Sequence, residues 1–288
     1  MPEYTNGFSF GLDPVLARIG PVSVRWFAFC IALGITIGVY LTIRQARQRE
    51  IASGPVYTAA LWCLVAGIVG ARLFHLVDKL DYYLQNPYLL PSLYQGGMAV
   101  WGGILGGLVA LLVYSRRHSG SRAPAGGLQF VRLADLGTAG LAAGLAIGRI
   151  GSLVNGESWG TQTTLPWAII YTNPDARLPV ASLGIPTHPY PIYEGIAILV
   201  AYLVSRLARR GARPGVESLA FLLVYAFARF GLTYVREEGI VVFGLQQAQL
   251  VAAAVLLVGL PWLVWLLTGR PSAESALDQP RDFTQSPR

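Results

Sequence analysis

The stretch LQQAQLVAAAVLLVGLPWLVWLL, residues 245–267, contains no charged residue over its whole length. An apolar run of about 20 residues is long enough to cross the ~30 Å hydrocarbon layer of a bilayer as an α-helix. Six further runs of this kind lie upstream, at about 22–43, 56–77, 98–115, 132–153, 191–208 and 217–235. The sequence therefore predicts an all-α polytopic membrane protein with seven transmembrane helices in one domain, residues 1–267.

The overall composition favours the same class. Hydrophobic residues make up 53% of the 288 positions, charged residues only 13%, and the mean hydropathy is +0.49. A soluble domain with an apolar core has no need of several runs of membrane-spanning length. Glycines do not argue against helices here, because small residues let membrane helices approach closely. Gly140, Gly144 and Gly148 form one such stripe, which predicts packing rather than chemistry.

The basic residues predict the orientation, because cytoplasmic loops near helix ends carry the excess of Lys and Arg. One set of segments holds Arg44, Arg47, Arg49, Arg116, Arg117, Arg122, Arg132, Arg206, Arg209, Arg210, Arg213, Arg270, Arg281 and Arg288. The opposite set holds Arg18, Arg25, Lys79, Arg177 and Arg236. The N-terminus is therefore expected outside the cytoplasm and residues 268–288 as a disordered cytoplasmic tail.

The net charge of +7 follows mostly from this asymmetry. Nucleic acid is not an expected partner, because the basic residues are not gathered into one soluble groove with stacking aromatics. Both cysteines, Cys30 and Cys63, lie inside predicted helices, where a thiol behaves as a small apolar side chain. We expect neither a metal nor a cofactor.

Three arginines, Arg72, Arg149 and Arg229, fall inside the predicted spans, where an ionisable group is costly and usually functional. At 1.5 Å per residue from the cytoplasmic helix ends, they lie roughly 24, 25 and 18 Å deep, in the outer half of the membrane. This shared depth predicts one cavity. Tyr225 and Thr233 lie four residues to either side of Arg229, and Arg236 follows, so all four are expected on one helix face.

Several guanidinium groups in the outer leaflet fit a phosphate, which accepts paired hydrogen bonds from their planar fork. An anionic phospholipid headgroup is the natural ligand. The alternative is that the arginines pair with Glu157, Glu194 or Asp78 and hold helices together, and both can hold at once.

The external segment at about 154–190 is too long for a simple connector. It carries Trp159, Trp167, Tyr171 and Tyr190, and aromatic residues of this kind favour the membrane interface. We expect an ordered element there that acts as a lid.

The segment GRIGSLVNGESWG, residues 148–160, resembles the signature of the phosphatidylglycerol:prolipoprotein diacylglyceryl transferases. TLPW at 164–167 resembles the loop that follows, and HPYPIYE at 188–194 resembles the His-Pro-x-Gln-Leu-Tyr-Glu motif of that family. Gly70-Ala71-Arg72 and Gly96-Gly97-Met98 also fit, and the correspondence runs from about Ser23 to the last helix.

The resemblance implies transfer of a diacylglyceryl group from phosphatidylglycerol to the lipobox cysteine of a prolipoprotein, at the outer leaflet of the bacterial cytoplasmic (inner) membrane. The implied partners are phosphatidylglycerol and the prolipoprotein signal peptide. Arg149, Arg229 and Tyr225 take the catalytic role by this resemblance, with the arginines stabilising the departing phosphate. The implied substrate-binding residues are Arg72, Arg236, Glu157, Gly160, Glu194 and Trp101.

Four positions depart from the family pattern. Trp101 stands in place of the usual histidine, Ser152 in place of asparagine, Phe27 in place of tyrosine and Thr233 in place of glutamate. Tryptophan cannot take a proton from a thiol, so either the cationic pocket itself lowers the thiol pKa or another base, such as His75, substitutes.

Two function classes remain open. One is a divergent transferase that clamps phosphate. The other is a catalytically silent relative that binds anionic phospholipid as a scaffold or partner subunit. A transporter or channel would need a polar pathway through the inner half of the membrane, where the sequence places no ionisable residue away from the helix ends.

Overall fold

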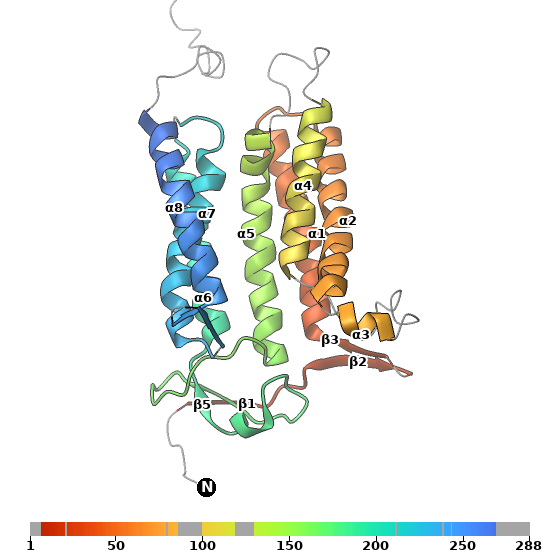
Figure 1. Ribbon diagram of the computed structural model, residues 1–288, viewed down its shortest axis with the longest axis vertical. Coiled ribbons are helices and arrows are strands. Elements are labelled where there is room, and N and C mark those ends of the chain that lie inside the picture. Colours follow the sequence, from red (N-terminus) through yellow and green to blue (C-terminus); the bar gives the residue numbers. More distant parts are fainter. Residues whose placement is uncertain are drawn as a thin grey trace, which may run out of the picture.

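The computed structural model describes residues 7–20, 22–78, 80–85, 100–118, 130–210, 212–237, 239–242 and 244–268. Its α-helices are α1 (Trp26–Gln48), α2 (Ser53–Asp78), α3 (Leu80–Gln85), α4 (Val100–His118), α5 (Phe130–Asn155), α6 (Tyr190–Ala208), α7 (Val216–Leu232) and α8 (Gln247–Thr268). The long helices run alongside one another, with α5 between α1, α2 and α4 on one side and α6, α7 and α8 on the other (Figure 1).

Within the described residues, six helices are long and apolar enough to cross a membrane. These are Trp26–Gln48, Ser53–Val77, Phe130–Asn155, Tyr190–Ala208, Val216–Val235 and Gln247–Thr268. They confirm the polytopic helical membrane class. The run expected at 98–115 is also helical, as α4, and packs along α2. Residues 269–288, the expected tail, lie outside the described part of the chain.

Glycines set the close helix contacts. A side chain at Gly38 of α1 would place its Cβ 2.8 Å from the backbone oxygen of Gly140 on α5, and one at Gly34 would come within 3.0 Å of the oxygen of Gly144. A real Cβ does not approach an oxygen so closely without displacing it, so these bare positions let the two backbones touch. The predicted packing role of the Gly140 and Gly144 stripe is confirmed.

Two predicted helix starts were wrong. Residues 22–25 form strand β3 (Val22–Arg25), which pairs antiparallel with β2 (Val15–Ile19), and α1 begins at Trp26. Near the C-terminus β7 (Leu245–Gln246) pairs with β6 (Ile240–Val242) before α8 begins. In Val22–Arg25 valines alternate with polar residues, which is the period of a strand, whereas counting apolar residues alone extends the helix.

Residues 154–190, which the sequence predicts as an external segment, are ordered and contribute to a small sheet. Strand β4 (Ile169–Tyr171) pairs in parallel with β1 (Phe8–Phe10) and antiparallel with β5 (Pro186–Thr187), and a 3₁₀ turn covers Val180–Ser182. The Tyr171 hydroxyl donates a 2.9 Å hydrogen bond to the Leu153 carbonyl of α5. Burial raises the pKa of Tyr171, so its hydroxyl stays a donor. This sheet and the β2–β3 hairpin lie at one end of the bundle, the sheet end (Figure 1).

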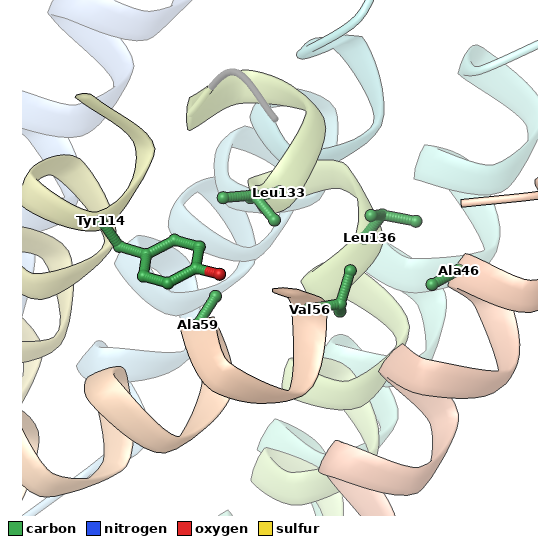
Figure 2. Close-up of a cluster of buried hydrophobic side chains, with 6 residues drawn as sticks. All are labelled: Ala46, Val56, Ala59, Tyr114, Leu133 and Leu136. Atoms are coloured by element: carbon green, nitrogen blue, oxygen red, sulfur yellow. The ribbon is translucent and has the colours of Figure 1, made fainter. Parts of the chain in front are cut away.

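A buried apolar cluster holds helices together at the opposite end. Figure 2 shows its members, which come from α1, α2, α4 and α5: Ala46, Val56, Ala59, Tyr114, Leu133 and Leu136. The Tyr114 hydroxyl satisfies its hydrogen-bonding need by donating to the Pro55 carbonyl at 2.8 Å.

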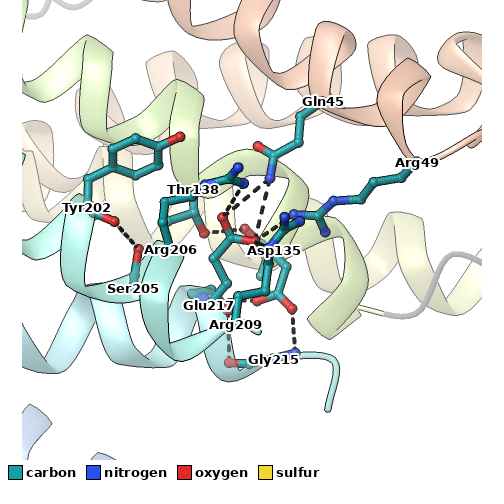
Figure 3. A network of polar contacts seen from close by, with 12 residues as sticks. Gln45, Arg49, Asp135, Thr138, Tyr202, Ser205, Arg206, Arg209, Gly215 and Glu217 are labelled. Atoms are coloured by element: carbon teal, nitrogen blue, oxygen red, sulfur yellow. Dashed lines mark hydrogen bonds and ion pairs between the residues drawn. The ribbon is translucent and has the colours of Figure 1, made fainter. Parts of the chain in front are cut away.

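A charged network ties four helices at that same end (Figure 3). Glu217 of α7 is fully buried and meets Arg49, the residue that follows α1, at 2.6 Å, with Arg206 and Arg209 at 3.4 and 3.5 Å. Asp135 of α5 accepts backbone N–H bonds from Gly215 and Ser218 at 2.6 and 2.8 Å. Asp135 thereby satisfies N–H groups that the first turn of α7 leaves without an intrahelical partner. We call the end of the bundle that holds Glu217 and its three arginines the arginine-rich end.

Candidate functional site

The site is centred on Glu194, whose side chain is completely buried in the first turns of α6. Arg149 of α5 approaches its Oε1 atom with Nη2 at 2.9 Å, and Arg229 of α7 pairs with the same oxygen. The Tyr225 hydroxyl donates to that oxygen at 2.5 Å. Three helices thus converge on one carboxylate near the sheet end.

The local sequence explains how α6 presents this carboxylate. Pro191 lies in the first turn of the helix, where its missing N–H group costs nothing. Tyr190 and Glu194 are four residues apart and therefore share a face. Gly195 lies beside Arg149, because a Cβ at this glycine would be 3.8 Å from the Cβ of that arginine.

Tyr225 and Arg229 share a face of α7, as the spacing predicts. The Arg229 Nη1 atom donates to the Tyr225 hydroxyl at 3.2 Å. The prediction that Arg236 continues this helical face was wrong. The α-helix ends at Leu232 and a 3₁₀ turn covers Thr233–Val235, after which Arg236 has extended backbone.

Arg236 nevertheless reaches the site by a different route. Its guanidinium lies over the ring of Tyr190, 5.4 Å from the ring centroid. The backbone of Arg236 pairs with Gly160 in an isolated antiparallel bridge. A Cβ at Gly160 would stand 2.5 Å from the Cβ of His188 and 2.8 Å from the Val235 carbonyl. The absence of a side chain at Gly160 thus permits a tight backbone approach.

The charges of this cluster do not cancel. Arg149 and Arg229 contribute two positive charges and Glu194 one negative charge, so these three side chains carry a surplus of one positive charge. The pairing with Glu194 that the sequence offers as one alternative is therefore seen for Arg149 and Arg229.

Glu157 serves the loop rather than the arginine cluster. The Asn155 side chain donates to its Oε1 atom at 2.6 Å, and Arg177 lies 3.9 Å from it. Arg25, at the end of β3, donates to Asn155 at 3.0 Å and to the Asp175 carbonyl at 3.1 Å. Arg25 and Asn155 were not singled out from the sequence, because nothing in their spacing shows that these distant segments meet.

Arg72 lies in the other half of the bundle. Its side chain is buried on α2, and its guanidinium lies 5.5 Å from the ring centroid of Tyr83. The ring of His75 meets the same tyrosine edge-on at 5.9 Å. Because α5 separates α2 from α6 and α7 (Figure 1), the base role considered for His75 gains no support from this arrangement.

The replaced family positions lie in several places. A Cβ at Gly151 of α5 would be 3.2 Å from the Cα of Phe27, which places Phe27 against α5 beside the buried Ser152. Thr233 is buried, and its hydroxyl donates to the Arg229 carbonyl at 2.5 Å. Trp101 is in the first turn of α4. The Trp101 and Asp78 side chains and residues 96–98 lie outside the described part of the structure.

His188 is the histidine nearest the site in the chain, two residues before Tyr190. Its Nδ1 atom lies 3.4 Å from the Tyr193 hydroxyl, which also accepts a 2.7 Å bond from the Trp167 indole. Burial lowers the pKa of His188, so the imidazole is neutral near pH 7. Among the described residues there is no group of three or more His, Cys, Asp and Glu side chains placed to hold a metal.

Comparison with known proteins assigns the chain to a family. The model of the prolipoprotein diacylglyceryl transferase family matches residues 14–265. Similar proteins named phosphatidylglycerol–prolipoprotein diacylglyceryl transferase occur in Rhodospirillum centenum, at 34% identity over 92% of this chain and 95% of the relative, and in Synechococcus elongatus, at 32% identity over 88% and 87%. A relative of the same name in Trichormus variabilis is 30% identical over 93% of this chain and 95% of its own length.

Proposed function

Since this chain belongs to the prolipoprotein diacylglyceryl transferase family, we propose that it moves the diacylglyceryl group of phosphatidylglycerol onto the lipobox cysteine of a prolipoprotein at the outer leaflet. The observation that carries the proposal is the arginine cluster, in which Arg149 and Arg229 pair with the buried Glu194 and Arg236 lies over the ring of Tyr190. A site for an anionic lipid headgroup needs such a cluster at the membrane depth of the phosphate.

The charge of the cluster fits the course of the reaction. The cysteine sulfur forms a bond to the terminal glyceryl carbon of the diacylglyceryl group, and the bond from that carbon to the phosphate oxygen breaks. The phosphodiester starts with one negative charge and leaves as glycerol phosphate, on which a second charge develops. The surplus of one positive charge that Arg149, Arg229 and Glu194 carry favours the departing group over the substrate, as preorganised donors do in a transition state. The thiol proton is taken up by the second phosphate oxygen of the monoester and leaves with it.

On the basis of these contacts we assign a separate role in the reaction to each residue of the site. Arg149 and Arg229 bind the phosphate, and their fixed geometry comes from the shared Glu194 oxygen. Tyr225 is a positioning residue, because its hydroxyl donates to that oxygen. Arg236 supplies the third charge and Gly160 the close backbone contact beside it. To Arg72, in the half of the bundle beyond α5, and by resemblance to Trp101, we assign binding of the acceptor peptide or the lipid chains.

The remaining features form part of the same proposal. We infer that α4 crosses the membrane as a seventh span, that the N-terminus lies outside and the C-terminus in the cytoplasm of a bacterial inner membrane, and that residues 154–190 act as a lid. The sheet end then faces the side on which prolipoproteins present their lipobox, and the signal peptide of the prolipoprotein is the partner recognised there. The arginine-rich end agrees with the cytoplasmic excess of positive charge.

The test is thioether formation on a lipobox peptide with phosphatidylglycerol vesicles, comparing Arg149→Lys with Arg177→Lys. An ammonium cannot reproduce the bidentate fork on a phosphate, so Arg149→Lys should slow turnover by about 10²–10³-fold. Arg177 is a matched control, because its side chain is 60% exposed and it makes only a 3.9 Å ion pair with Glu157. Its substitution should change turnover less than about threefold.

Restoration of lipoprotein lipidation in cells depleted of their own transferase tests the same proposal in vivo. A parent protein without turnover in either assay, but with lipid bound, is a silent relative. Parent turnover that is insensitive to Arg149→Lys places the chemistry elsewhere in the chain.

A further inference from the structure

Two buried polar atoms at the centre of the site have no hydrogen-bond partner among the described residues. They are the Oε2 atom of Glu194 and the hydroxyl of Tyr190. Both side chains are fully buried. A buried polar atom without a partner costs roughly 1–3 kcal/mol, so such atoms at a binding site indicate a ligand that completes them.

Both atoms belong to the arginine cluster but are not used by it. Arg149, Arg229 and Tyr225 all contact the other oxygen of Glu194, Oε1. Oε2 is thus left as an acceptor, and Tyr190, four residues earlier on the same helix face, offers a hydroxyl that both donates and accepts. Its ring is held in place by the Arg236 guanidinium.

We propose that Glu194 Oε2 and the Tyr190 hydroxyl form a subsite for the two hydroxyl groups of the glycerol headgroup, next to the arginines that take the phosphate. This inference rests on the proposed function, because it assumes that a phospholipid enters the cluster by its headgroup. One headgroup hydroxyl donates to Glu194 Oε2, and the other exchanges a hydrogen bond with Tyr190. Tyr190 occupies the variable position of the motif that the family shares, so sequence comparison does not single it out.

The charges of the cluster explain why a neutral diol fits better than an amine. An ammonium group also donates to a carboxylate, but here it would enter a site where Arg149 and Arg229 already outweigh the negative charge of Glu194. Like charges within a few ångströms repel in a partly buried site. The subsite therefore selects against ethanolamine by charge. It selects against an alkyl phosphodiester, because that headgroup leaves Oε2 and the tyrosine hydroxyl without partners.

The experiment compares phosphatidylglycerol with phosphatidylpropanol, which has the same phosphate and a propyl group without hydroxyls, and with phosphatidylethanolamine. The protein carries Tyr190→Phe or, as a matched control on the same helix, Tyr202→Phe. Affinity is measured by lipid-dependent thermal stabilisation in detergent, and transfer by competition between lipids for the lipobox peptide. In the parent and the control, phosphatidylglycerol should be preferred over phosphatidylpropanol by roughly tenfold or more.

In Tyr190→Phe this preference should fall roughly three- to tenfold, through weaker use of phosphatidylglycerol with phosphatidylpropanol unchanged. Without lipid the variant should melt at or above the parent temperature, because it loses a hydroxyl without a partner. A merely structural role of the hydroxyl would instead lower the melting temperature and weaken both lipids equally. Either that result, or equal use of phosphatidylglycerol and phosphatidylpropanol by the parent protein, overturns the subsite.

The experiments distinguish a failure of the transferase proposal from a failure of the headgroup subsite. Discrimination between the lipids in binding, without thioether formation, would remove the transferase and leave the subsite in place. Thioether formation with a lipid preference that Tyr190→Phe does not change would remove the subsite and leave the transferase.

Discussion

Replacing Glu217 by glutamine should destabilise the arginine-rich end more than any single surface change. Glu217 is the one carboxylate at which Arg49, Arg206 and Arg209 meet, at 2.6, 3.4 and 3.5 Å. Burial, together with the positive charge of Arg49, lowers the pKa of Arg209, which is the effect expected where cations crowd. Glutamine keeps the size of the side chain and removes the charge that holds the three arginines together.

The magnitude follows from the exposure of the partners. Removing one member of a buried ion pair costs about 3–5 kcal/mol. Arg206 and Arg209 are 38% and 36% exposed and can turn into water, whereas Arg49 is 24% exposed. We therefore take the lower bound, about 3 kcal/mol, after discounting the exposed partners. At about 2–4 °C per kcal/mol for a chain of this size, the melting temperature should fall by roughly 6–12 °C.

The assay is thermal unfolding of the purified protein in detergent, with Glu237→Gln as the matched control. Glu237 is exposed, and its substitution should move the midpoint by less than about 2 °C. Adding Arg209→Gln to Glu217→Gln should recover part of the loss, because the double variant has one cation fewer to repel its neighbours. A shift for Glu217→Gln no larger than that of the control, or a double variant whose loss is the sum of both single losses, would refute the reasoning.

Further predictions concern topology, the tight backbone contact and pH. A reporter fused after Arg288 should read as cytoplasmic and one inserted near Pro174 as external; the reverse result would place the arginine cluster on the wrong side. Gly160→Ala should cost about 1–3 kcal/mol of stability and most of the transferase activity, because its Cβ would stand 2.5 Å from that of His188. Gly239 has open space around it, so Gly239→Ala should lower neither the stability nor the activity. Equal effects of Gly160→Ala and Gly239→Ala would count against the close contact at Gly160. Burial lowers the pKa of His188, so the unfolded chain binds the proton more readily and stability falls as the pH drops below the ordinary histidine value of about 6.5. His188→Gln should flatten this pH dependence of the melting temperature, and an unchanged slope would assign it to other groups.

The helices show how much of the fold can be predicted from hydropathy. Every run marked from apolar length is helical in the structure, because a membrane helix needs that length whatever its neighbours are. The errors lie at two helix starts, at 22–25 and 245–246, where short strands come before the helix. A strand pair depends on a partner segment, and apolar length carries no information about that partner.

The candidate site shows more clearly what the spacing of residues in the sequence does not predict. Spacing predicts that Tyr225 and Arg229 meet, because four residues make one helical turn, and the structure confirms it. Spacing does not predict that Arg149 and Arg229 share one oxygen of Glu194, nor that Arg236 arrives over Tyr190 from beyond the helix end. The sequence marks Tyr190 only as one of the aromatic residues of the segment at 154–190 and as part of the motif at 188–194, and neither ties it to the arginines.

The sequence by itself determined that the chain is a polytopic membrane protein, which runs become helices and, through its motifs, to which family it belongs. Those properties follow from length, composition and local spacing, which act along the chain. Only the tertiary structure decided which charges meet: Arg149 and Arg229 at Glu194 at one end, and Arg49, Arg206 and Arg209 at Glu217 at the other. A buried ion pair joins different helices, and its partners are chosen by the side-by-side order of those helices, which helical periodicity does not contain.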